Sequence, residues 1–87
     1  MNQEQLINEL RVIIAETIEI DDFTDDENFI SDLGVDSMMI IEIVARLEKK
    51  YRIDIEESYL HQMTTFNQLV ATVKEIMESN GQVGGGR

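Results

Sequence analysis

The 87-residue sequence contains no cysteine, no proline and no tryptophan, and only 7 of its residues are lysine or arginine. Without cysteine there is no disulfide framework and no cysteine-ligated zinc site, so any thiol must come from an attached group. The basic residues are outnumbered by 18 aspartates and glutamates, and the net charge is −11. This sign excludes nucleic acid as a partner, because its phosphates require a basic surface.

Long apolar runs are also missing. No segment approaches the roughly 20 apolar residues of a membrane-spanning helix. The first four residues are polar and not basic, unlike the start of a signal peptide. We therefore expect a cytoplasmic, monomeric protein that makes no membrane contact, with a length that fits one small domain.

The acids are unevenly placed along the chain. Nine of the 18 lie between residues 16 and 36, and no lysine or arginine occurs between Arg11 and Arg46. A negative field of this kind favours basic protein partners. A calcium-binding loop is an alternative, but no register places glycine sixth and glutamate twelfth: counted from Asp22, these positions are Glu27 and Leu33. A solvated acidic loop is the simpler interpretation, and we expect no metal site.

Apolar periodicity predicts an all-α fold, a four-helix bundle with antiparallel helices, a long first loop and a short third helix. The first helix spans about residues 3–16, with Asn2 as its N-cap. A loop over 18–35 follows, which apolar side chains should pin to the core. The predicted pins are Ile18, Ile20, Phe23, Phe29, Ile30 and Leu33.

The second helix is expected over residues 37–50, with Asp36 as its N-cap. Its predicted buried stripe is Ile40, Ile41, Val44, Leu47 and Tyr51, with Ile43 alongside. A short third helix over 56–62 precedes a last helix capped by Thr65 and Gln68. Asn80 and Gly81 should end that helix. The expected division is a domain over 1–80 and a flexible glycine-rich tail over 81–87.

Ser37 is the strongest candidate for chemistry. It follows a glycine-containing turn and opens a helix, where unpaired N–H groups and the helix dipole favour a phosphate ester. No base that could activate the serine is visible nearby, and His61 is the only histidine. We therefore interpret Ser37 as an attachment point on a protein that is not an enzyme. The alternative is an unmodified acidic adaptor in which Ser37 is only a capping residue.

The run from Leu33 to Met38 resembles the Asp-Ser-Leu signature of acyl carrier proteins. The resemblance covers most of residues 3–78, and further matching segments lie at 40–44, 47–48, 51–55 and 63–66. It implies that a phosphopantetheinyl transferase attaches 4′-phosphopantetheine from coenzyme A to Ser37. It further implies that acyl intermediates are then carried as thioesters, and that acyltransferases, ketosynthases or other acyl-processing enzymes are the partners.

The family uses its second helix for recognition, so the resemblance implies docking residues there. The candidates are Asp36, Met38, Met39, Glu42 and Arg46. Methionine is soft and adaptable, and at least one of the pair should be exposed on the first turn. The resemblance also implies that an acyl chain enters between the helices. Its expected lining is Ile41, Val44, Leu60 and Val73.

Two departures from the family pattern concern the pathway. Met39 stands where many members carry a carboxylate, and Arg46, Lys49, Lys50 and Arg52 stand where fatty-acid carriers tend to be acidic. These differences favour polyketide or related specialised biosynthesis over a primary fatty-acid role. The alternative within the family is an aminoacyl or peptidyl carrier of a nonribosomal pathway. Such carriers often have histidine before the serine, so Asp36 is more typical of an acyl carrier.

Overall fold

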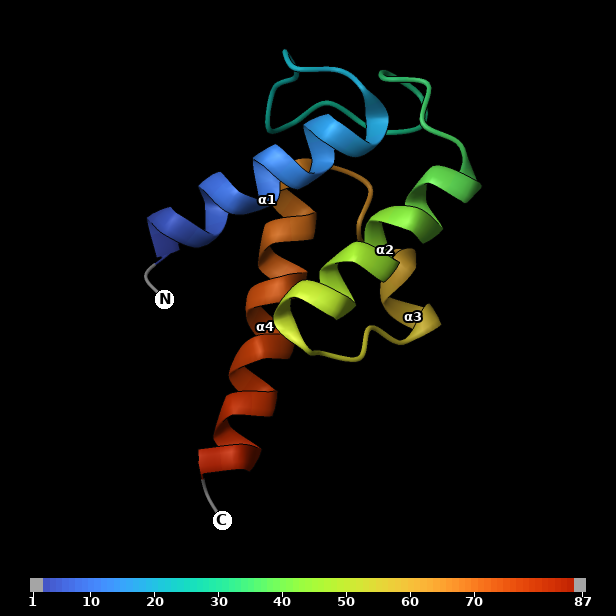
Figure 1. The fold of residues 1–87 in the computed structure, drawn as a ribbon. Coiled ribbons are helices and arrows are strands. Elements are labelled where there is room, and N and C mark those ends of the chain that lie inside the picture. Colours follow the sequence, from blue (N-terminus) through green and yellow to red (C-terminus); the bar gives the residue numbers. More distant parts are fainter. Residues whose placement is uncertain (1–2, 86–87) are drawn as a thin grey trace.

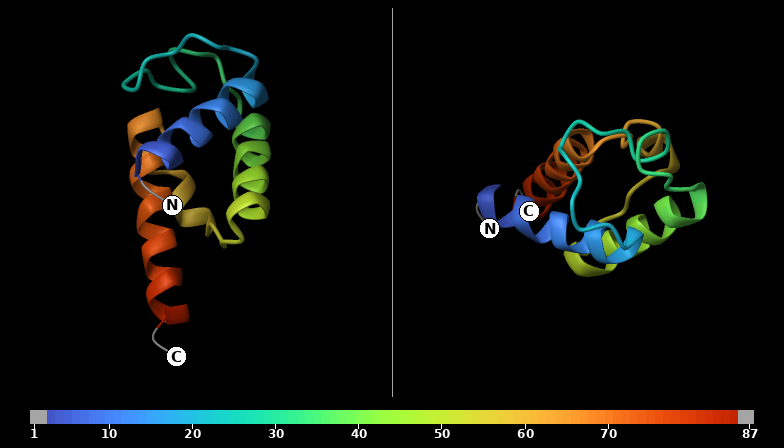
Figure 2. Two further views of the ribbon diagram at one scale, coloured as in Figure 1. Left: turned by 60° about the vertical axis from the view of Figure 1, so that its left-hand side comes forward. Right: turned by 90° about the horizontal axis from the view of Figure 1, so that it is seen from above.

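The computed structural model describes residues 3–85, and its side chains through residue 79. Its elements are α1 (Gln3–Ile18), α2 (Ser37–Tyr51), α3 (Glu57–Leu60) and α4 (Phe66–Gly85). Figures 1 and 2 show α2 and α4 descending together, α1 crossing near the loop, and α3 beside the lower part of α2. Among residues 3–85 the extended structure is limited to one isolated bridge between Asn28 and Thr65, so the all-α prediction is confirmed.

The core is built from apolar side chains at helical spacing. In α1 the stripe Leu6, Leu10, Ile14 and Ile18 repeats every four residues and is buried along its length. In α4, Phe66, Leu69, Val73 and Ile76 meet it. Each fully buried side chain of this size contributes roughly 1.5–3 kcal/mol of transfer free energy. None of the described helices combines the length and apolarity that crossing a membrane requires.

The predicted buried stripe of α2 is confirmed in full only at Ile43 and Leu47. Three of its other members pack half-buried against the core: Ile40, Val44 and Tyr51. Ile43 is 1% exposed and Leu47 is fully buried, whereas Ile41 is 59% exposed. The prediction that Ile41 is buried is therefore wrong. Two residues correspond to about 200° of rotation in an α-helix, so Ile41 must point away once Ile43 faces α1 and α4.

The loop over residues 19–36 is tied into the core by aromatic side chains. Phe23 and Phe29 are buried, and Phe23 packs edge-to-face on Phe66 with ring centroids 5.6 Å apart. The N–H of Phe29 donates to the carbonyl of Thr64 at 2.8 Å. The prediction that apolar residues pin the loop is confirmed for Ile18, Phe23 and Phe29, with Ile20 and Leu33 half-buried. It is wrong for Ile30, which is 57% exposed, and it omitted Val35, which is buried.

Arg11 holds the first half of the loop from α1. Its guanidinium carbon lies 4.4 Å from the ring centroid of Phe66 and 5.3 Å from that of Phe23. Nη1 donates to the carbonyl of Phe23, and Nη2 pairs with the carboxylate of Asp25. One side chain therefore joins α1, the loop and the start of α4.

Asn28 organises the second half of the loop. Its Oδ1 accepts from the N–H groups of Ile30 and Ser31, and its own N–H donates to Asp32 Oδ2 at 2.8 Å. The N–H of Val35 then donates to the carbonyl of Phe29 at 2.8 Å. The chain makes this return through Gly34 at φ 70°, in the left-handed region where glycine has no steric penalty. The turn delivers the backbone directly to the start of α2.

The lower end of α2 is fixed to α1 through Glu9. The Tyr51 hydroxyl donates to Glu9 Oε1 at 2.9 Å, and Lys50 Nζ lies 4.0 Å from the same oxygen. Burial raises the pKa of the Tyr51 phenol above its ordinary value, and the hydrogen bond to Glu9 and its negative charge add to the shift. Tyr51 is therefore the protonated donor in this contact at neutral pH.

The start of α4 agrees with the prediction, and its end does not. Thr65 Oγ1 accepts from the N–H of Gln68 at 3.2 Å, so the predicted N-cap is confirmed. The predicted stop at Asn80 and Gly81 is wrong, because α4 continues to Gly85. Glycine costs a helix about 1 kcal/mol but does not block it as proline does, and no proline follows. The domain and tail division stays a prediction, and Asn2 and residues 86–87 lie outside the described residues.

Replacing Gly34 should destabilise the fold through backbone conformation alone. A Cβ built at this position meets no atom within 4 Å, so steric overlap does not contribute. We expect Gly34→Ala to lower the free energy of unfolding by about 1–2 kcal/mol and Gly34→Asn to lower it less, because asparagine tolerates the left-handed region. Urea denaturation measures both, and equal losses for the two variants would contradict the assignment.

Candidate functional site

Ser37 opens α2 with an exposed side chain. Asp36 precedes it with extended backbone, and Asp36 Oδ1 accepts from the N–H of Met39 at 2.9 Å. The predicted N-cap is therefore confirmed. Because Asp36 fills the capping role, the hydroxyl of Ser37 is not needed for it. Among the described residues, the N–H groups of Ser37 and Met38 have no acceptor, and the helix dipole favours an anion at this end.

Ser37 is one of the residues that line an apolar groove of about 310 Å³. The groove lies between the loop, the first turns of α2, and the segment from α3 to the start of α4. Its polar groups are confined to three residues, and the remaining lining is hydrocarbon or thioether. The lining residues are Phe29, Ile30, Ser37, Ile40, Ile41, Leu60, His61, Met63 and Thr64.

The expected acyl lining is half right. Ile41 and Leu60 line the groove. Val44 and Val73 do not, because Val44 packs against the core and Val73 is completely buried within it. Six further side chains that line the groove were not predicted to do so: Phe29, Ile30, Ile40, His61, Met63 and Thr64. No local pattern indicates them, since the groove forms only through the packing of the loop and the α3 segment against α2.

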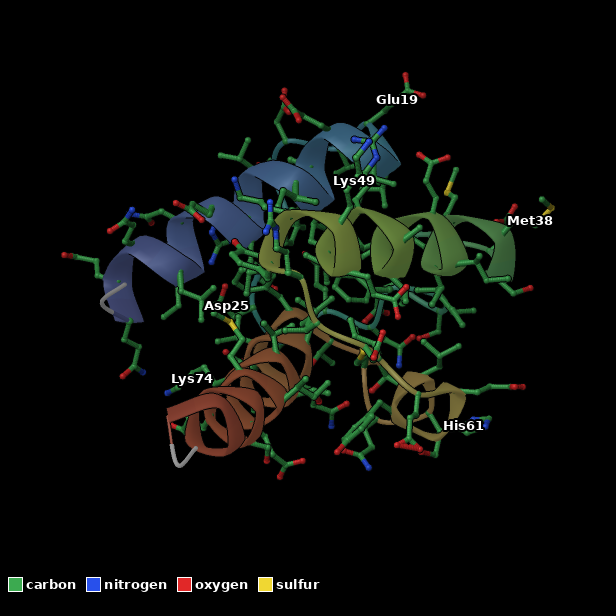
Figure 3. The ribbon with its side chains drawn as sticks, turned by 60° about the horizontal axis from the view of Figure 1, so that its bottom comes forward. Glu19, Asp25, Met38, Lys49, His61 and Lys74 are labelled. Atoms are coloured by element: carbon green, nitrogen blue, oxygen red, sulfur yellow. The ribbon has the colours of Figure 1, made fainter. Side chains whose placement is uncertain are left out.

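The predicted docking residues separate into an exposed set and one half-buried residue. Met38 is 77% exposed, whereas Met39 packs partly against the core, as expected for a pair of which one is exposed. Glu42 and Arg46 are exposed and pair at 3.4 Å, one helical turn apart. Asp36 is exposed beside Ser37. Figure 3 shows Met38 projecting from the outer end of α2, away from the core.

The site has no constellation for catalysis within the described residues. Ser37 Oγ makes no hydrogen bond to a histidine or carboxylate there, so nothing holds a general base against it. His61 borders the same groove and is exposed. Over the same part of the chain, no three acidic or histidine side chains converge in a geometry that would hold a metal ion.

Comparison of the sequence with known proteins identifies its family. The family described as "Phosphopantetheine attachment site" matches residues 8–73. The chain belongs to the acyl carrier protein family. It is 32% identical over 77 residues to an acyl carrier protein of Streptomyces coelicolor, covering 85% of this chain and 84% of that protein.

Two further relatives carry more specific names. A polyketide-8 synthase acyl carrier protein 2 of Streptomyces avermitilis is 41% identical over 59 residues, or 66% of this chain and 68% of that protein. A meromycolate extension acyl carrier protein of Mycolicibacterium smegmatis is 34% identical over 80 residues, or 90% and 81% of the two chains. The family's cofactor is a covalently bound 4′-phosphopantetheine, and its members interact with acyl-processing enzymes.

The residues at the start of α2 fit this cofactor. An acyl carrier needs an exposed hydroxyl for the phosphate ester, and Ser37 is exposed at the positive end of a helix. The thiol must come from the cofactor, because the chain has no cysteine. The adjoining groove offers apolar surface to whatever the cofactor carries.

Asp36 should stabilise the site without being part of the attachment chemistry. We expect Asp36→Ala to lower the free energy of unfolding by about 1 kcal/mol, because Met39 loses its cap, and Asp36→Asn to retain most of that stability. Urea denaturation measures the difference. Asp54→Ala is the control, since it removes the same charge from an exposed loop position. Equal losses for Asp36→Ala and Asp54→Ala would show that the cap contributes nothing.

Proposed function

We propose that Ser37 carries the 4′-phosphopantetheine arm of this acyl carrier protein. The observation that carries the proposal is an exposed hydroxyl, unused in capping, at the start of α2 and in the lining of an apolar groove. A phosphopantetheinyl transferase joins Ser37 Oγ to the phosphorus nearest pantetheine in coenzyme A. The pyrophosphate bond breaks, adenosine 3′,5′-bisphosphate leaves, and a base on the transferase takes the hydroxyl proton. The arm supplies a terminal thiol for acyl thioesters.

The protein itself positions the arm and leaves the chemistry to its partners. Asp36 fixes the first turn of α2, and Met38, Glu42 and Arg46 form the surface that enzymes contact around Ser37. Met39 lies beneath that surface and supports it from the core side. Under this proposal the protein is not an enzyme. It is a cytoplasmic monomer to which acyltransferases and ketosynthases bind one after another.

The pathway follows from the relatives and from the chain's own charges. Two relatives are named as acyl carrier proteins of a polyketide synthase and of meromycolate extension. The cationic residues 46–52 distinguish α2 from the acidic helix expected of a fatty-acid carrier. We therefore assign the chain to polyketide or related specialised fatty-acid biosynthesis. Loading by an adenylation enzyme instead of an acyltransferase would favour a peptidyl carrier.

Modification of Ser37 is tested by intact-mass spectrometry. The protein is incubated with coenzyme A, magnesium and a broad-specificity phosphopantetheinyl transferase. We expect the mass to rise by one phosphopantetheine group, and Ser37→Ala to remain unmodified while keeping its helical circular dichroism. Ser58→Ala, at another exposed serine, is the control and should be modified normally. A folded wild-type protein that two different transferases leave unmodified would point to an unmodified adaptor.

The groove should accept an alkyl chain carried by the arm. Because its lining is almost entirely apolar, a saturated chain loses water contact there without burying an unpaired polar group. We expect methyl NMR signals of Ile41 and Leu60 to shift between the unacylated and octanoyl-loaded forms. Val12, exposed on α1 away from the groove, should not shift. Identical Ile41 and Leu60 signals in the two forms would show that the chain stays outside.

A further inference from the structure

The outward face of α2 changes character from one end to the other. Exposed residues recur every three or four positions and therefore share one face of the helix. Near Ser37 this face is apolar and acidic, and toward the end of α2 it is basic. In order, its residues are Met38, Ile41, Glu42, Ala45, Arg46 and Lys49. Twelve residues separate Ser37 from Lys49, which corresponds to about 18 Å along a helix.

The basic end of α2 is only partly neutralised by its own surroundings, because Arg46 pairs with Glu42 and Lys50 Nζ lies 4.0 Å from Glu9 Oε1. Four of the chain's 7 lysines and arginines fall within residues 46–52. Lys49 and Arg52 are exposed, and neither forms an ion pair with a described residue. The one acid among these residues, Glu48, turns away and accepts from the N–H of Ile55 at 2.8 Å. Positive charge therefore stands free on this face of a strongly acidic protein.

Favourable interaction with the helix dipole accounts for only part of this cluster. Lys49 and Lys50 lie in the last turn of α2, where cations are stabilised. Arg46 precedes that turn. Arg52 is the C-cap residue that follows the helix, in a left-handed conformation with φ 55°. The pair with Glu42 accounts for Arg46 only at its exposed surface, and no ion pair among the described residues accounts for Arg52.

We propose that Arg46, Lys49 and Arg52, the basic end of α2, dock against acidic side chains of the enzyme that receives the arm. The proposal rests on Ser37 being the attachment residue. A partner that covers Met38 and Ile41 at the arm end extends along the same helix face to Lys49. Its surface must therefore be apolar or basic near the arm and acidic about 18 Å away. This two-sign pattern fixes the direction in which α2 lies on the enzyme and rejects uniformly basic surfaces.

Other occupants fit less well. A second copy of this chain brings another net charge of −11, and nucleic acid or an anionic lipid surface is repelled in the same way. An acidic patch on an otherwise basic enzyme entrance satisfies both ends of α2. The inferred partner is thus an enzyme with carboxylates set to one side of its active-site entrance.

The test compares charge reversal at two lysines. Lys49→Glu changes the basic end of α2, and Lys74→Glu makes the same change in net charge on α4, away from Met38 (Figure 3). Each protein is loaded with the arm and the same acyl group. The probes are two ketosynthases of known structure. About 18 Å from the active-site entrance, one carries acidic side chains and the other carries basic side chains. The second-order rate of acyl transfer is measured at low and high salt.

We expect Lys49→Glu to lower the rate with the acidic probe about tenfold and to raise it with the basic probe, and both effects to shrink in salt. Lys74→Glu should stay within about twofold of wild type on both probes. Equal effects of the two reversals would overturn the inference, because net charge alone would then explain them. Intact mass reports loading beforehand, so a wild-type protein that takes up no arm contradicts the proposed function itself.

Discussion

The anchoring of the loop over residues 19–36 is the constraint on which the rest of this protein depends. Phe23 and Phe29 bury their rings, and Arg11 holds Asp25 and the carbonyl of Phe23 while stacking on Phe66. Long segments without regular structure are entropically costly to order, so an ordered one needs such contacts. These contacts keep the loop attached to the helices although it carries eight acidic residues at or near the surface.

The site follows from where that loop ends. Gly34 turns the chain, Asp36 caps α2, and Ser37 emerges with its hydroxyl unused. The same loop supplies Phe29 and Ile30 to one wall of the groove, while α2 and the α3 segment supply the others. The proposed attachment point and the apolar groove are therefore two products of one packing arrangement. Lys49, which forms no ion pair with a described residue, remains available for the recognition that we propose.

Features set by neighbouring residues were predictable from the sequence. The caps at Asp36 and Thr65 depend on a spacing of three residues between the capping side chain and the N–H that it accepts from, and the structure has them. Features set by tertiary packing were not. A run of isoleucines does not show which one faces inward, so Ile41 was misplaced, and nothing local indicates that Arg11 lies over Phe66. The position of Ser37 was predictable, and the groove beside it only in part.

The most direct test of this account is the rate of phosphopantetheine transfer when the loop is loosened. Arg11→Met keeps an apolar stem but removes the pairing with Asp25 and Phe23, and Lys74→Met is the matched loss of charge on α4. With circular dichroism confirming folded helices, the account predicts slower transfer to Ser37 in Arg11→Met and an unchanged rate in Lys74→Met. The account would be contradicted if Arg11→Met accepted phosphopantetheine at the wild-type rate although faster amide exchange at Phe29 and Val35 showed that its loop had loosened.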